Sequence, residues 1–150
     1  MYTMHSNSGP IILVEDNESD AEVARRAIER SSPTRTLVVV GDGLSAAEML
    51  LGTEGQAPCP RPRLMMIDIN LPGLDGIELL TRIRSNPDLR GVAVVIVSSS
   101  AEERDIRKAY DRGCNSYVTK PLDIRALQSL YASVVNYWTQ TNIGYPKPVG

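Results

Sequence analysis

The stretch "LMMIDINLPG" (Leu64–Gly73) places a single acid in an otherwise apolar run. Between Leu64 and Ile69 every residue except Asp68 is apolar, which is typical of a buried strand. A buried carboxylate costs free energy unless it is paired, hydrogen-bonded or bound to a metal ion. The breakers in "NLPG" end the strand directly after the acid, so Asp68 belongs at a strand tip, where it needs a partner.

The composition argues against several classes of function. The chain has 150 residues, 42 % of them hydrophobic and 23 % charged, as expected for one globular domain. The net charge of −2 does not indicate the basic surface that nucleic-acid binding needs. No apolar run approaches the ~20 residues of a membrane span. The N-terminus lacks the features of a secretory signal, and the two cysteines form no metal or disulfide pattern. We therefore expect a cytoplasmic protein with no nucleic-acid or membrane partner.

Apolar runs alternate with amphipathic stretches along the chain. Five short strands are predicted, at residues 10–16, 36–41, 64–69, 91–97 and 116–119. Helices are predicted between and after them, at residues 20–31, 44–52, 76–87, 98–113 and from about 123 onward. This alternation indicates an α/β fold, a doubly wound five-stranded parallel sheet with helices on both faces.

Two capping boxes are predicted to start helices. Ser19 with Glu22, and Asp75 with Glu78, have the spacing at which a polar side chain caps a helix and an acid lies three residues later.

Polar residues gather where the predicted strands end. Ligands of open parallel sheets bind at the carboxyl ends of the strands, so these residues should share one edge. They comprise three acids, a cluster of hydroxyls and one lysine: Glu15, Asp16, Asp68, Ser98 to Ser100 and Lys120. Clustered carboxylates repel one another unless a cation joins them, and oxygen ligands suit Mg²⁺ better than zinc.

A divalent cation beside a lysine and a hydroxyl is suited to a phosphoryl group, whose oxygens both positive charges neutralise. One carboxylate would then be the nucleophile and form an aspartyl phosphate. Asp68 is the best candidate, because it is the lone acid on the most apolar strand.

The segments "ILVEDN", "MMIDINLPGLDGIELL", "VVIVSSS" and "NSYVTKPL" resemble the response-regulator receiver domain of two-component signalling. The similarity covers residues 10 to about 138, with the landmarks in the family's order and spacing. It implies strand order 2-1-3-4-5 and a signalling role rather than an enzymatic one.

The resemblance also implies roles for individual residues. Asp68 matches the phosphoacceptor, Asp16 the direct Mg²⁺ ligand (Mn²⁺ being the alternative ion), and Glu15 a ligand acting mostly through water. The backbone carbonyl of Asn70 would complete the metal site. Lys120 would bridge a phosphoryl oxygen, Ser98 and Tyr117 match the switch pair, and the peptide bond before Pro121 is expected to be cis.

A second, narrower resemblance is to the single-domain regulators of bacterial phytochrome-type histidine kinases, carried by "EDNESDAEVARRA", "SSSAEERDI" and "NSYVTKPLD…YWTQTN". It implies a histidine kinase as partner, and dimerisation through the last helix and the segment after it. We predict a flexible N-terminus (1–9), a receiver domain (10–138) and a C-terminal extension (139–150) that serves as a dimerisation arm. Alternatively, Tyr137 and Trp138 complete the intramolecular core.

Structural alternatives stay open for single residues: Asp68 as a backbone cap, Lys120 as a solvated lysine, Tyr117 as a half-buried strand aromatic and Ser98 as a turn hydroxyl. Among functions, the rivals are a phosphorelay intermediate, a degenerate receiver that only binds proteins, and a Mg²⁺-dependent aspartyl-phosphate phosphatase. Phosphatases of the haloacid-dehalogenase kind need an aspartate two residues after the nucleophile, and here that residue is Asn70.

Overall fold

The sheet has the predicted topology. A computed structural model describes residues 9–146 and contains five parallel strands in the order β2-β1-β3-β4-β5. The strands are β1 (Ile11–Val14), β2 (Leu37–Val40), β3 (Leu64–Ile67), β4 (Ala93–Ser98) and β5 (Ser116–Thr119). The helices are α1 (Glu18–Ser31), α2 (Gly43–Leu51), α3 (Gly76–Ser85), α4 (Glu103–Asp111) and α5 (Ile124–Asn136).

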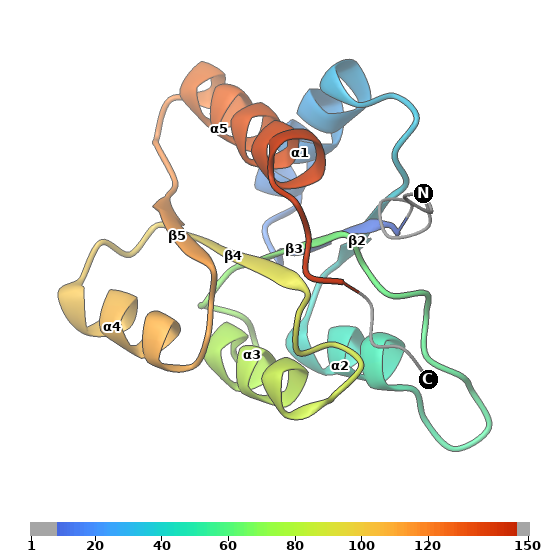
Figure 1. Cartoon of the computed structure of the whole chain (residues 1–150). Coiled ribbons are helices and arrows are strands. Elements are labelled where there is room, and N and C mark those ends of the chain that lie inside the picture. The colour runs from blue at the N-terminus through green and yellow to red at the C-terminus, as the bar shows by residue number, and fades with distance from the viewer. Residues whose placement is uncertain (1–8, 147–150) are drawn as a thin grey trace.

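The sheet separates two helix layers (Figure 1). Alternate residues of a strand point to opposite faces, so β1 and β3 contribute to both cores. Ile12 and Met65 pack in the core beneath α2, α3 and α4. Leu13 and Met66 pack in the core beneath α1 and α5. Both faces are therefore covered, which explains why these strands are apolar along their whole length.

The register aligns the carboxyl ends of the central strands. Val14 of β1 pairs with Ile67 of β3, so the next residues, Glu15 and Asp68, leave the sheet at the same level. Ser98 pairs with Thr119 at the end of β4 and β5, and Lys120 follows directly. The strand tips therefore converge as predicted.

One predicted helix start is correct and the other is wrong. The Asp75 side chain accepts from the backbone N–H of Glu78, 2.9 Å away, and caps α3. Helix α1, however, is capped by Asn17, whose side chain accepts from the N–H of Asp20. Ser19 lies inside the first turn, because β1 ends at Val14 and the following turn is short enough for Asn17 to open the helix.

The chain after α5 folds back on the domain. It continues as a π-helical turn, η2 (Tyr137–Thr141), in which Thr139 is buried and its hydroxyl donates to the carbonyl of Val135. Arg63 then donates to the carbonyl of Asn142, 2.7 Å away. The segment therefore contacts the domain after η2. It is described as far as Pro146.

Residues 1–8 and 147–150 lie outside the described part, and with them most of the predicted flexible N-terminus. No helix in residues 9–146 combines the length and apolar character that a membrane span requires.

Candidate functional site

Three acids meet at the ends of β1 and β3. Oxygen atoms from Glu15, Asp16 and Asp68 all lie within 4.8 Å of one another. Glu15 and Asp68 are 3 % and 6 % exposed, whereas Asp16 faces solvent. An all-oxygen set with one open side is the donor type that Mg²⁺ and Mn²⁺ accept. The structure therefore brings together the three carboxylates predicted to hold a metal ion.

Lys120 reaches into this cluster from the end of β5. Its ammonium donates to Glu15 Oε2 at 2.5 Å, to Asp68 Oδ2 at 2.9 Å and to Asp20 Oδ2 at 3.1 Å. Its side chain is only 7 % exposed. The three N–H donors of an ammonium match these three carboxylates, so Lys120 is not a solvated surface lysine.

Charge in the cluster is unbalanced. Burial alone would lower the pKa of Lys120, but its hydrogen bonds to the carboxylates of Glu15 and Asp68 outweigh this effect and raise that pKa well above its usual value. Burial raises the pKa of Glu15, although Lys120 and the N–H of Asn17 oppose the shift. Both pKa values are raised, which favours the charged form of Lys120 but disfavours the charged form of Glu15, because several carboxylates share one ammonium and Glu15 is only partly compensated. The remaining negative charge favours a divalent cation.

Asp20 is the site residue that sequence reasoning missed. It lies in the first turn of α1, with a side chain 29 % exposed, and its carboxylate contacts Lys120. The available signal was its place in the acid-rich run that follows β1, but its orientation depends on where α1 begins.

Both carboxylate oxygens of Asp68 accept hydrogen bonds. Lys120 donates to Oδ2, and the backbone N–H of Asn70 donates to Oδ1 at 3.1 Å. These donors fix the orientation of the carboxylate at the strand tip. Asn70 itself is exposed, next to Asp68 at the strand tip.

The hydroxyl residues connect to the loop after β4. Ser98 is fully buried, and its Oγ accepts from the N–H of Ser100 at 3.2 Å. The hydroxyl of Tyr117 donates to the carbonyl of Ser100 at 2.7 Å. Ser98 and Tyr117 therefore hold the same loop residue, while the backbone of Lys120 donates to the carbonyl of Ser98.

The predicted cis bond is absent. All peptide bonds in residues 9–146 are trans, including the one between Lys120 and Pro121. Trans is the lower-energy form of an X–Pro bond, by roughly 0.5–1 kcal/mol.

Gly76 leaves space for the backbone of Asp68. A Cβ at Gly76 would lie 2.1 Å from the carbonyl oxygen of Asp68 and 2.9 Å from Cα of Ile69. We expect Gly76→Ala to displace the strand tip and lower the free energy of unfolding by about 1–3 kcal/mol, measured by chemical denaturation. Gly41→Ala is the control, because a Cβ there meets no atom of residues 9–146 within 4 Å. An equal effect of both changes would contradict this explanation.

Comparison with known proteins gives a consistent result. Residues 11–132 match the response regulator receiver domain. The chain is 33 % identical over 141 residues to the response regulator Rcp1 of Synechocystis sp., a match covering 92 % of this chain and 96 % of that protein. The structure of the Mn²⁺-bound form of Rcp1 superposes with a TM-score of 0.85 at 31 % identity, covering 92 % and 99 % of the two chains.

A further solved structure, the phosphorylated cyanobacterial phytochrome response regulator RcpA, also has a TM-score of 0.85, at 34 % identity and with the same coverage. The sheet order, the acids at the strand tips, the lysine among them and these matches agree. The chain belongs to the response regulator receiver domain family.

Proposed function

We propose that the chain is a single-domain response regulator that accepts a phosphoryl group on Asp68 from a histidine kinase. The observation that carries the proposal is the contact between Lys120 and Asp68 inside a cluster of further carboxylates. Mg²⁺, or Mn²⁺ in its place, would be held by Glu15, Asp16, Asp68 and the carbonyl of Asn70, and would neutralise charge on the phosphoryl oxygens. The Mn²⁺-bound structure of Rcp1 supports this ion chemistry.

In the transfer, an Asp68 oxygen forms a bond to phosphorus while the bond from phosphorus to the kinase's histidine nitrogen breaks. The electron pair of the broken bond stays on the imidazole. Asn70 and Lys120 orient the attacking carboxylate, and Lys120 then donates to a phosphoryl oxygen. The test is uptake of one phosphoryl group from acetyl phosphate in the presence of Mg²⁺, located on Asp68 by mass spectrometry.

The kinase partner is proposed to be of the phytochrome type. The supporting observation is the similarity to RcpA, described as a cyanobacterial phytochrome response regulator. Output would then occur by protein contact in the cytoplasm, with no nucleic-acid or membrane partner and no chemistry beyond gain and loss of the phosphoryl group. A phosphorelay intermediate uses the same site and is the second candidate. Multiple turnover of phosphate esters would instead favour the phosphatase.

We propose Ser98 and Tyr117 as the switch, because both contact Ser100 in the loop before α4. Beryllofluoride, a phosphoryl mimic, should change the hydrogen exchange of residues 98–105 in the natural protein. Ser98→Ala should bind the mimic but lose most of that change. Ser99→Ala, at an exposed neighbour, should behave like the natural protein. A full response in Ser98→Ala would exclude the switch role.

The proposed homodimer would use α5 and residues 139–150. Exposed apolar side chains support this surface: Tyr137 is 49 % exposed, Tyr145 68 % and Ile143 91 %. Light scattering should give the mass of a dimer for the natural protein and a monomer for Ile143→Asp. Leu44→Asp, which removes an exposed apolar residue on α2, is the control and should stay dimeric. A monomeric natural protein, with and without beryllofluoride, would contradict the proposal.

A further inference from the structure

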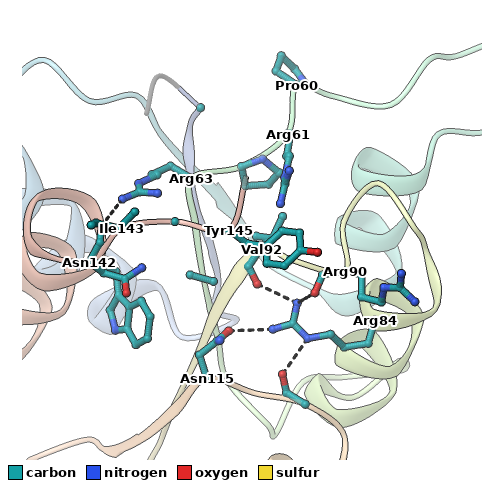
Figure 2. Close-up of a pocket in the computed structure, with 17 residues that line it drawn as sticks. Pro60, Arg61, Arg63, Arg84, Arg90, Val92, Asn115, Asn142, Ile143 and Tyr145 are labelled. Carbon is teal, nitrogen blue, oxygen red and sulfur yellow. Dashed lines mark hydrogen bonds between the residues drawn. The ribbon is translucent and has the colours of Figure 1, made fainter. Parts of the chain in front are cut away.

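A cavity of about 740 Å³ lies at the sheet edge opposite Asp68. Gly9, Arg63, Val92 and Asn115, which line it, immediately precede or lie close before β1, β3, β4 and β5. Residues 142–145 form another wall (Figure 2). The cavity is therefore built from the amino ends of the strands and from the segment after η2, and none of the proposed phosphorylation residues lines it.

The lining is strongly cationic. Four arginines are among the residues that line the cavity, Arg61, Arg63, Arg84 and Arg90, and the described lining residues include no aspartate or glutamate. The Arg90 side chain points away from the other three (Figure 2), and its carbonyl faces Arg84. None of the four forms an ion pair within residues 9–146, whereas arginines on the exposed faces of α1 and α4 pair with neighbouring acids. An unpaired group of guanidiniums around a hollow favours an anion.

Within residues 9–146, every acceptor that holds Arg84 is neutral. It donates to the carbonyls of Gly113, Arg90 and Val92 and to Oδ1 of Asn115, each at 2.8 Å (Figure 2). These bonds orient the guanidinium without neutralising its charge. Burial accordingly lowers the pKa of Arg84. The charge remains available to an anion in the cavity.

On the other side of the cavity, several guanidinium donors have no acceptor among the described residues. Nε of Arg63 is buried and has no acceptor among the described residues, although its Nη2 donates to Asn142. Burial lowers the pKa of Arg63, and the charge of Arg35 lowers it further. The Arg61 side chain points toward the Tyr145 ring (Figure 2), and neither Arg61 nor Arg90 donates a side-chain hydrogen bond within residues 9–146.

We propose that this cavity binds a small anion of the phosphate class, such as a diphosphate or nucleotide. Planar guanidinium forks match phosphate oxygens, and the volume lies within the roughly 300–1,000 Å³ usual for small-molecule sites. Aromatic rings of Trp138 and Tyr145 line the same space and offer a surface for the organic part of a nucleotide. Because residues 142–145 form a wall, the bound anion also ties this segment to the domain.

Calorimetric titration of the full chain tests the site, with inorganic pyrophosphate in one arm and ADP in the other. EDTA is present so that metal at Asp68 cannot recruit phosphate. Saturable binding at one site per chain is expected for both, and tighter binding of ADP would assign the aromatic walls to its base. The double variant Arg61→Gln, Arg63→Gln should bind at least about tenfold more weakly, since a hydrogen bond from a charged donor to the anion is lost at each position.

Two controls separate this site from the proposed function. Arg82→Gln changes an exposed arginine of α3 that does not line the cavity, and Asp68→Asn removes the phosphoacceptor. Both should bind pyrophosphate as the natural protein does. Absence of saturable binding, unchanged affinity in the double variant, or loss of affinity in Asp68→Asn would overturn the proposal.

A second readout follows residues 139–146. Pyrophosphate should slow hydrogen exchange in this segment, because it contacts the wall that Asn142 and Tyr145 form. Arg63→Gln, which also loses the bond to Asn142, should start with faster exchange and respond less. Binding that leaves the segment's exchange unchanged would place the anion elsewhere and overturn the assignment.

Discussion

Asp68→Asn should lower the rate of phosphoryl uptake from acetyl phosphate and from a cognate kinase on the order of a thousandfold or more. An amide is the same size as the carboxylate and its oxygen still accepts from Lys120, but it is not a competent nucleophile. The fold should survive, because removing one negative charge from a crowded acidic cluster relieves repulsion. Intact-protein mass spectrometry after incubation with Mg²⁺ and donor measures the uptake.

Asp75→Asn is the matched control. Asp75 is also an acid near the turn after β3, but its side chain caps α3, and asparagine caps equally well. Uptake should therefore be retained in this variant. Label carried by Asp68→Asn at the natural rate would refute Asp68 as the acceptor.

Lys120→Met should combine slower transfer with a metal-dependent fold. Methionine keeps most of the stem but removes the ammonium that contacts Glu15, Asp20 and Asp68. Leaving buried carboxylates without their partner should cost about 3 kcal/mol of unfolding free energy in EDTA. Excess Mg²⁺ should restore much of this loss, because an ion that binds only the folded state stabilises it.

Transfer should fall by about a hundredfold in the same variant even with saturating Mg²⁺, since one donor to the phosphoryl oxygens is gone. Denaturation with and without Mg²⁺ measures the first effect, and the rate of phosphoryl uptake measures the second. Lys108→Met, at an exposed lysine of α4, should change neither. Natural stability in EDTA would show that Lys120 does not neutralise the cluster.

Sequence patterns predicted the sheet and its edge because burial on both faces demands continuous apolar strands, such as Leu64–Ile67. They failed at the start of α1. Asn17, Ser19 and Asp20 can all cap a helix, and the position at which β1 ends determines which of them does so. Asp20 was missed for the same reason, because the residue at which α1 begins determines where the Asp20 side chain points.

The placement of the C-terminal segment also could not be predicted from local sequence patterns. Its placement depends on Arg63 before β3 and on Gly91 before β4, where a Cβ would lie 2.4 Å from the ring of Tyr145. Such contacts join residues far apart in the chain, so periodicity around Tyr145 carries no sign of them.

The wide span of the Lys120 contacts has a consequence during synthesis. Glu15 and Lys120 are 105 positions apart, and they meet only once β5 has joined the sheet. A growing chain that ends before β5 thus carries the acids without the ammonium that balances them. Competence to receive a phosphoryl group should therefore appear only after β5 has been synthesised. A nascent chain that lacks β5 should not compete with the complete domain for phosphoryl groups.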